Sequence, residues 1–399
     1  MSNRKQVLIL GGGFAGVEAA IFLKKWNYDI TLVSDRDYFY IYPTSIWVPT
    51  RESEFSDVCI NLNALQKAHG FKLIVDGVEK ISAKDASVTL KSGKVIDDYD
   101  HLIVAIGASK MKHQGIENTL SICGAPEQAL LLRDKVDEMV EKGGGKICFG
   151  FGGNPNDTSA VRGGPGFELL FNVHNLLKKK GIREHFELTF FAPMAEPGKR
   201  MGPNALKMMD KFFGMLNINQ HFGKKIKSFE KDGIIFEDDS KLDSDFTMFI
   251  PAGDGHDVIK DSDLPLNEAG FIKTDDFSEV EFDIENSARD HRIYAIGDVA
   301  ALEGYEWRAK QGHIAEVQAR NVAHNIAQKD NDTLSFKGYN DHLNILCVMD
   351  TGDGASFVYR DDKRAFMIPM PIVGHWLKKG WGSYCRYSKL GKIPRIPGM

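Results

Sequence analysis

The sequence predicts an α/β fold with two Rossmann-like domains and a C-terminal amphipathic segment that docks on a membrane. Two strand–helix–strand openings indicate the two domains, one at the N-terminus and one beginning at about Lys146. The tail from Lys363 to Met399 contains eight basic residues and no acidic one, although the whole chain has a net charge of −5. An acidic body with a basic tail favours binding to phosphates or anionic lipid. The length of 399 residues allows two or three domains.

Composition excludes several classes of protein. Hydrophobic residues make up 43% of the chain and charged residues 26%, which excludes disorder, collagen and coiled coil as global descriptions. The five cysteines are too widely spaced for a disulfide framework or a CxxC pair, and the 12 histidines form no HExxH motif. We therefore expect no metal site. The apolar run from Val7 to Leu23 contains three consecutive glycines, which is not typical of a signal peptide, so the sequence predicts a cytoplasmic origin.

A glycine-rich turn follows the first strand. Gly11, Gly13 and Gly16 form a GxGxxG pattern between an apolar strand and a helix. The first glycine permits the turn, the second lets the backbone approach a pyrophosphate, and the third lets the helix pack on the strand. Asp35, which follows Ser34, lies 19 residues after Gly16, near the spacing expected of an acidic residue that binds ribose. The turn therefore predicts a dinucleotide site.

Two later segments indicate that the dinucleotide is FAD. Val104–Gly107 resembles a strand end of two-dinucleotide flavoproteins, and the segment ending in Gly297 and Asp298 resembles their second FAD fingerprint. In that resemblance Asp298 binds the ribityl chain, and a helix beginning near Val299 points its N-terminus at the flavin. We therefore expect FAD as the cofactor, with Gly107, Gly297 and Asp298 in its site.

The second strand–helix–strand unit lacks the features of a nucleotide site. The nearest GxGxxG match runs from Gly150 to Pro155, where proline replaces the third glycine, and about ten more residues precede the helix. Ala192 and Pro193 stand at the end of the next strand, where an acidic residue would bind ribose. A tight pyrophosphate turn cannot accommodate such an insertion, so we expect an electron donor other than a pyridine nucleotide.

Six segments spread along the chain share one resemblance. They are Ile30–Trp47, Ser121–Cys123, Gly164–Glu168, Ala309–Gly312, Leu346–Asp350 and Trp376–Tyr387. On these segments the chain resembles the sulfide:quinone oxidoreductase family, most weakly between residues 195 and 285. The resemblance implies that Pro43 lies beside the flavin and that Lys310 lies near flavin and quinone. It also implies a catalytic Cys347, a flavin-adjacent thiolate activated by a positive charge such as that of Lys310, and an accessory Cys123.

The chain departs from this family at one cysteine. The family's second cysteine, which pairs with the third in carrying sulfur beside the flavin, falls at Val161 or Arg162. Cys148 is no obvious substitute, because it lies in the middle of an apolar strand and is expected to be a buried small hydrophobe. Arg162 could instead attract an anionic donor such as hydrosulfide or a persulfide.

The tail predicts a short interfacial helix. Ile372, Trp376, Gly380 and Tyr384 recur at a spacing of four residues, and further apolar residues flank them together with lysines. Interfacial helices combine an aromatic-rich apolar face with a basic rim, and a hydrophobic quinone lives in the bilayer. We therefore expect a peripheral, monotopic membrane protein.

These patterns divide the chain into three parts. The FAD-binding domain is predicted to comprise residues 1–115 and 270–345. Residues 116–269 are predicted to form the second Rossmann-like domain, without an intact NAD(P) site, and residues 346–399 a segment that contacts membrane and quinone.

The expected function is electron transfer from sulfide, or a related sulfur donor, through Cys347 and FAD to a quinone. The expected partners are quinone, small sulfur species, the membrane surface and a second copy of the chain in a homo-oligomer, with no nucleic acid. Three alternatives remain open: a type II NADH dehydrogenase, a non-catalytic flavoprotein that senses redox state, and a flavocytochrome sulfide dehydrogenase flavoprotein. The last would be exported, which the missing signal peptide disfavours.

Overall fold

Two parallel β-sheets form the framework of the molecule. The computed structural model describes residues 4–282 and 292–395. The first sheet has the strand order β19-β9-β1-β2-β5 and the second the order β13-β12-β11-β17, with every pairing parallel. The strands of the first sheet are β1 (Gln6–Leu10), β2 (Asp29–Ser34), β5 (Lys72–Val75), β9 (His101–Val104) and β19 (Arg292–Ala295). Those of the second are β11 (Gly145–Phe151), β12 (Phe186–Ala192), β13 (Ile218–Phe222) and β17 (Phe246–Ile250).

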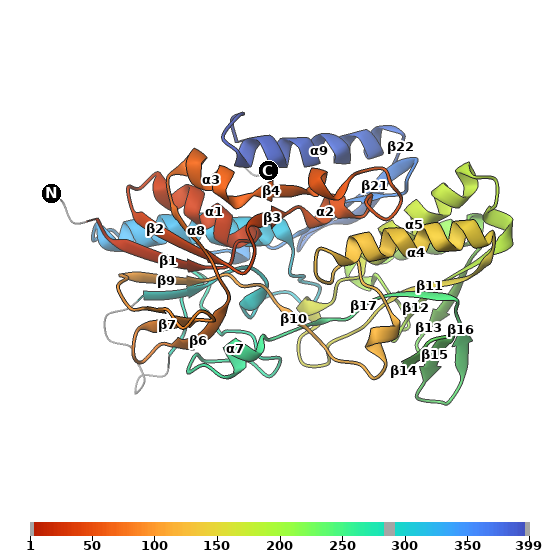
Figure 1. Cartoon of the computed structure of the whole chain (residues 1–399), viewed down its shortest axis with the longest axis horizontal. Helices are drawn as coiled ribbons and strands as arrows, with labels where there is room; N and C mark the ends of the chain where they lie inside the picture. The colour runs from red at the N-terminus through yellow and green to blue at the C-terminus, as the bar shows by residue number, and fades with distance from the viewer. Residues whose placement is uncertain (1–3, 283–291, 396–399) are drawn as a thin grey trace.

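Helices cover one face of the first sheet and a small antiparallel sheet covers the other. Successive residues of a strand point to opposite faces. Val7 and Ile9 accordingly pack with the helices α1 (Phe14–Lys24), α3 (Leu62–His69) and α8 (Gly312–Asp330). Leu8 and Leu10 pack with β6 (Val78–Ser82), β7 (Ser87–Leu90) and β8 (Val95–Ile96). The first domain is therefore built in three layers, which Figure 1 shows on its left side.

The second sheet is covered in the same way. The helices α4 (Gln128–Lys142), α5 (Gly164–Lys179) and α6 (Pro203–Met215) pack on one face in a core rich in phenylalanine. On the other face Phe191 and Phe249 pack against β14 (Ile226–Glu230) and β15 (Gly233–Phe236), which continue into β16 (Lys241–Asp243). The smaller elements are β3 (Tyr38–Tyr40), α2 (Tyr42–Ser45), β4 (Cys59–Asn61), β10 (Ser109–Lys110), β18 (Gly253–Asp254) and α7 (Asp257–Lys260).

The tail contains more secondary structure than the single short helix that the sequence predicts. It forms an antiparallel sheet of β20 (Ile345–Asp350), β21 (Gly354–Arg360) and β22 (Ala365–Pro371), followed by the helix α9 (Val373–Lys389). Figure 1 shows α9 lying along the top of the molecule, above α2 and α3. The helix has 17 residues rather than the short span expected, because Pro369 and Pro371 lie in β22 and the next proline follows its end. No helix of the described chain combines the length and apolarity needed to cross a bilayer.

Two further expectations need correction. The residues near Val299 form only the three-residue turn Gly297–Val299, and the helix that was expected to begin there is α8, which begins at Gly312. The basic tail is in part an internal feature, since Lys378 and Lys389 are buried in ion pairs with carboxylates of the body.

Candidate active site

The glycine-rich turn after β1 has room for a pyrophosphate. Only residues 11–13 separate the end of β1 from the start of α1. Gly11 has a φ of +116°, and its amide donates to the carbonyl of Val33 at 2.8 Å, which locks the turn onto β2. Gly13 caps α1, and a Cβ atom placed on it would meet no protein atom within 4 Å. The helix N-terminus therefore opens onto free space, as a bound pyrophosphate requires.

The expected ribose-binding residues end β2. Ser34 is buried beneath the turn, whereas the side chain of Asp35 is 74% exposed and faces Arg36 at 3.5 Å. Gly107 follows β9, the strand on the other side of β1. It has a φ of +79° and open space around its Cβ position. These residues line the same edge of the first sheet and fit the adenosine part of FAD, since ligands bind at the carboxyl ends of parallel strands.

Gly297 and Asp298 lie where two helices begin. Gly297 has a φ of +72°, and its amide donates to Gln318 Oε1 of α8 at 2.9 Å. A Cβ on Gly297 would contact Ala15 of α1 and Ala315 of α8, so both helix N-termini meet at this turn. The positive end of a helix dipole expected near Val299 is therefore supplied by α8, from Gly312 onward.

The loop between β11 and α5 takes the place of a second nucleotide turn. It spans residues 152–163, against the three residues of the first unit. The loop packs on the first domain: Arg162 forms an ion pair with Asp298, and the Ser159 carbonyl accepts from the Lys310 amide at 3.0 Å. Asn154 donates to the Gly253 carbonyl at 2.8 Å. The expectation that this unit lacks a nucleotide site stays a prediction.

Lys310 is buried against this loop. Its ammonium donates to the Ala300 carbonyl and lies 3.9 Å from the ring centroid of Phe271. Burial lowers the pKa of Lys310 to about 7, although Asp157 acts in the opposite direction. The side chain is therefore able to gain and lose a proton near neutral pH.

Cys347 lies on β20 at the edge of the main hydrophobic core. Burial raises the pKa of its thiol to about 12, and the charges that act on it are those of Glu168 and Lys378. The expected activating charge, Lys310, is not among them. Cys347 is therefore a protonated thiol at neutral pH. Its conversion to the reactive thiolate depends on the charges of Glu168 and Lys378.

A buried polar network surrounds Cys347. Lys378 of α9 forms an ion pair with Glu168 of α5, whose Oε1 also accepts from the amide of Asp350 at 2.8 Å. The Asp350 carboxylate binds His375 Nδ1 at 2.7 Å and Asn172 Nδ2 at 3.0 Å. Burial raises the pKa of Glu168, while at Asp350 the contacts with His375 outweigh burial and lower the pKa. The network thus places two buried carboxyl groups together, one whose pKa is raised by burial and one whose pKa is lowered by its contacts.

Cys123 lies in the same hydrophobic core as Cys347 but faces different charges. Burial raises its pKa, and the cations that lower it are Lys110 and Arg162. Burial and Arg162 in turn lower the pKa of Lys110 to about 8. All five cysteines are free, and Glu168 is the charged group that acts on both Cys123 and Cys347. Pro43 is in α2, beneath α9, and is partly exposed.

Comparison with known proteins places the chain in a family. Residues 5–325 match a family model described as pyridine nucleotide-disulphide oxidoreductase. The chain belongs to the pyridine nucleotide-disulphide oxidoreductase family. As a member it is an oxidoreductase that binds FAD, and the open glycine turn and strand ends described above fit that cofactor.

Relatives within this oxidoreductase family confirm the predicted resemblance and fold. A sulfide-quinone reductase of Aquifex aeolicus (strain VF5) is 29% identical over 95% of this chain and 90% of its own length. The X-ray structure of the sulfide:quinone oxidoreductase from Aquifex aeolicus superposes with a TM-score of 0.85 at 26% identity, covering 98% of this chain and 93% of that one. A type II NADH:quinone oxidoreductase of Staphylococcus epidermidis (strain ATCC 12228 / FDA PCI 1200) is 22% identical over 92% of this chain and 93% of its own length.

Sequence reasoning misses several residues that this oxidoreductase gathers around its cysteines. They are Lys110, Glu168, Asp350, His375 and Lys378. Glu168 and Asp350 stand inside segments that carry the family resemblance, so a search for charged residues within apolar motifs could find them. Lys378 and His375 carry no such signal, because their partners are about 200 and 25 residues away in the sequence.

Proposed function

We propose that this chain is a membrane-associated flavoenzyme that passes electrons from sulfide, or a related sulfur donor, to a quinone. The observation that carries the proposal is the position of Cys347, a free thiol on β20 beside the buried Lys378–Glu168 pair. The similarity to the sulfide-quinone reductase of Aquifex aeolicus supports the choice of donor and acceptor. FAD, when bound, supplies the two-electron redox chemistry between them.

The Lys378–Glu168 pair is suited to moving protons. Oxidation of hydrosulfide to zero-valent sulfur releases a proton and two electrons, and reduction of a quinone to a quinol takes up two protons and two electrons. Burial raises the pKa of Glu168, and Lys378 forms an ion pair with this carboxylate. In the proposed reaction Glu168 accepts the proton that is released on the Cys347 side and passes it toward the quinone, and solvent supplies the second proton of the quinol.

Cations beside Cys123 support an anionic donor. Arg162 and Lys110 both act on the Cys123 thiol, and Arg162 is one of the two positions, with Val161, at which the family resemblance places a second cysteine. A guanidinium and an ammonium attract hydrosulfide or a persulfide by charge, without forming a bond to sulfur. In this proposal the donor meets one reactive cysteine, Cys347, rather than a cysteine pair.

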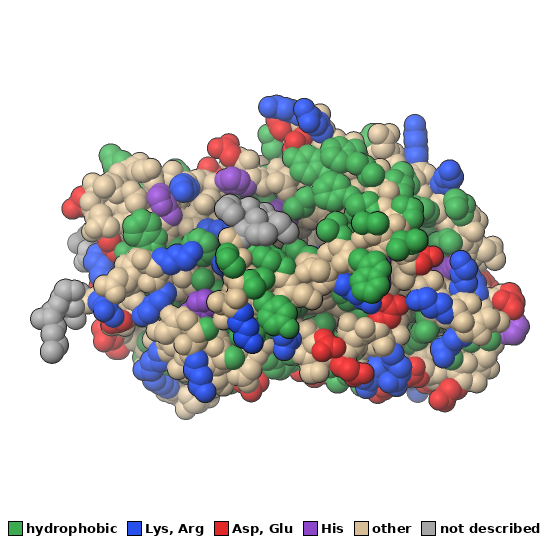
Figure 2. Space-filling view, turned by 90° about the horizontal axis from the view of Figure 1, so that it is seen from above, with side chains coloured by type: hydrophobic (Ala, Val, Ile, Leu, Met, Phe, Trp, Pro, Cys, Tyr) green, Lys and Arg blue, Asp and Glu red, His purple; other side chains and the backbone are tan. Residues whose placement is uncertain are grey.

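An apolar surface on α9 and the preceding strand supports membrane docking. We call it the α9 patch; it consists of Ile368, Ile372, Val373, Trp376 and Leu377, which are between 50% and 68% exposed. Figure 2, seen from above α9, shows hydrophobic side chains gathered on this face. Contiguous exposed apolar side chains of this size mark an interaction surface, and a bilayer is the source of a hydrophobic quinone.

Anaerobic reduction of the bound flavin tests the proposal. Sulfide should bleach the oxidised flavin absorbance of the wild-type protein, and Cys347→Ser should slow this at least about a hundredfold, since oxygen replaces the only thiol in the proposed path. Cys59→Ser is the matched control, because Cys59 lies on β4 outside the network, and it should react like the wild type. Unchanged bleaching in Cys347→Ser would reject the role of this cysteine.

A parallel sample with NADH tests the alternative donor. The similarity to type II NADH:quinone oxidoreductases favours NADH. The long loop at residues 152–163 disfavours it, as do Ala192 at the end of β12 and Pro193 directly after it. We expect no bleaching by NADH. Rapid bleaching by NADH but not by sulfide would replace the sulfur donor by a pyridine nucleotide.

A further inference from the structure

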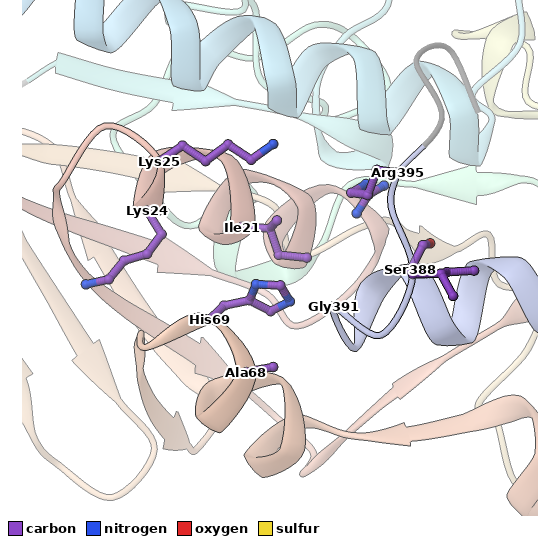
Figure 3. Close-up of a pocket in the computed structure, with 9 residues that line it drawn as sticks. Ile21, Lys24, Lys25, Ala68, His69, Ser388, Gly391 and Arg395 are labelled. Atoms are coloured by element: carbon purple, nitrogen blue, oxygen red, sulfur yellow. The ribbon is translucent and has the colours of Figure 1, made fainter.

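A basic cavity lies at the C-terminal end of α9, away from the α9 patch and from Cys347. Its volume is about 420 Å³; it is open to solvent and is lined by residues of α1, α3, the end of α9 and the segment that follows α9. Four basic side chains line it, namely Lys24, Lys25, His69 and Arg395. Figure 3 shows the side chain of Lys25 extending in the direction of Arg395 and the ring of His69 lying below them, next to Ile21 and Ala68, while Lys24 points away. None of the described residues that line it is acidic.

The buried carboxylates next to the cavity do not neutralise its positive charge. Beneath it a buried network joins the carboxylates of Glu18 and Glu316 to Lys389, Arg320 and Arg395, with Lys389 Nζ 2.7 Å from Glu316 and Arg395 Nη1 2.8 Å from Glu18. The three cations of this network outnumber its two carboxylates. Burial would raise the pKa of Glu18, but the cations around it lower that pKa, so the carboxylate stays ionised and holds Arg395 in place.

The cavity is distinct from the dinucleotide site. The glycine turn lies at the N-terminal end of α1, whereas Lys24 and Lys25 lie at its C-terminal end, 11 helical residues further on. At about 1.5 Å per residue the two ends are about 16 Å apart. A lysine at a helix C-terminus stabilises the helix dipole, but that effect needs no cavity and no convergence with Arg395 and His69.

The cavity continues the surface that carries the α9 patch. α9 has 17 residues, so its two ends are about 25 Å apart along one side of the molecule. Ile393 at the cavity rim and the neighbouring Tyr387 are 39% and 45% exposed, which extends apolar surface toward the cavity. A bilayer that receives the α9 patch would bring its headgroup layer to this end of the helix.

We propose that this cavity binds the phosphate group of an anionic membrane lipid and thereby fastens α9 to α1 and α3. The inference rests on the membrane association in the proposed function, and extends it by naming the lipid class. Convergent cations with apolar side chains at the rim match a phosphate joined to acyl chains. Free inorganic phosphate has the same charge but lacks the acyl chains, so experiment can separate the two sources.

Co-sedimentation of the FAD-loaded full chain with vesicles tests this. One set contains phosphatidylcholine alone, and the other contains about one-third phosphatidylglycerol. The wild type should prefer the phosphatidylglycerol vesicles, and Lys25→Gln should lower that preference at least about fivefold, the effect expected of one lysine at an anionic surface. Lys392→Gln is the matched control, because Lys392 is exposed beside the cavity but does not line it, and should change the preference less than about twofold.

Other outcomes overturn the assignment. Equal losses in Lys25→Gln and Lys392→Gln would assign the preference to the general field of the basic tail. Thermal protection of the wild type, but not of Lys25→Gln, by inorganic phosphate without any vesicle preference would assign the cavity to a free anion. The double variant Trp376→Ser/Leu377→Ser separates the two proposals, because it should lose binding to both kinds of vesicle. If it binds both as the wild type does, membrane docking through the α9 patch is rejected whatever the cavity holds.

Discussion

At the scale of single residues, burial sets the protonation of the groups near the candidate site. Lys310 is buried and Cys347 is partly buried, and both shifts favour the neutral form: the pKa of Lys310 falls to about 7 and that of Cys347 rises to about 12. Only Lys310 is thereby brought into the physiological range. Gly13 in the first turn contributes in another way, because its missing side chain leaves space for the cofactor's pyrophosphate.

Lys310→Met should change how stability depends on pH. Because the folded-state pKa of Lys310 lies below its unfolded value, the unfolded chain binds more protons between about pH 7 and pH 10. This residue therefore makes the free energy of unfolding rise with pH in that window, by at most about 1.4 kcal/mol per pH unit. Urea unfolding of both proteins from pH 7 to pH 10 should show the wild type gaining stability relative to the variant; a constant difference would contradict a depressed pKa.

Gly13→Ala should weaken FAD binding without harming the fold. A methyl group at Gly13 meets no protein atom within 4 Å, but it projects where the pyrophosphate approaches the start of α1. The dissociation constant for FAD should rise at least about tenfold, or about 1.4 kcal/mol, measured by flavin fluorescence on reconstitution of the apoprotein. Gly164→Ala is the matched control in the second unit, also with no atom within 4 Å, and should bind FAD normally.

At the scale of elements, α9 is tied to both domains by buried ion pairs. Lys378 binds Glu168 of α5 in the second domain, and Lys389 binds Glu18 of α1 and Glu316 of α8 in the first. Burial would lower the pKa of Lys389, but the two carboxylates outweigh it and raise the pKa, so this lysine stays charged. The helix that carries the apolar patch is therefore anchored through its charged residues.

Lys389→Met should destabilise the protein strongly. The change leaves the carboxylate of Glu18, which has no exposed surface, with one cation fewer, and removal of one partner from a buried ion pair costs about 3–5 kcal/mol. Urea unfolding at neutral pH measures the loss. Lys392→Met, an exposed change in the same segment, should alter stability by less than about 0.5 kcal/mol. Adding Glu18→Gln to Lys389→Met should recover part of the loss, and a purely additive result would contradict direct coupling.

At the scale of the whole molecule, the proposed site sits where three parts of the chain meet. Glu168 comes from the second domain, Cys347 from the first strand of the tail sheet, and Lys378 from the helix that also presents the α9 patch. Figure 1 shows α9 extending over both domains. Docking of this surface on a bilayer would place the cysteine network next to the source of a lipid-soluble quinone.

Trp376→Ser/Leu377→Ser should therefore separate two kinds of quinone. Both side chains are more than half exposed, so their replacement should leave the fold intact. Sulfide-dependent reduction of a long-chain quinone held in vesicles should fall at least about tenfold, since the loss of two apolar anchors weakens docking by about 2 kcal/mol or more. Reduction of a short, water-soluble quinone should be unchanged. Equal loss with both quinones would show that the patch serves the chemistry directly.

The sequence by itself determined the fold class and FAD as the cofactor, and the absence of a second nucleotide turn stays a prediction. All three rest on local features, because glycines, a strand end or a proline at one position set the backbone there. The tertiary structure decided which charges act on Cys347. The expected Lys310 faces the loop at residues 152–163, and Glu168 and Lys378 meet the thiol from α5 and α9. It also turned part of the basic tail inward, because the buried carboxylates of distant helices need cations and α9 supplies Lys378 and Lys389 to them when it folds back over both domains.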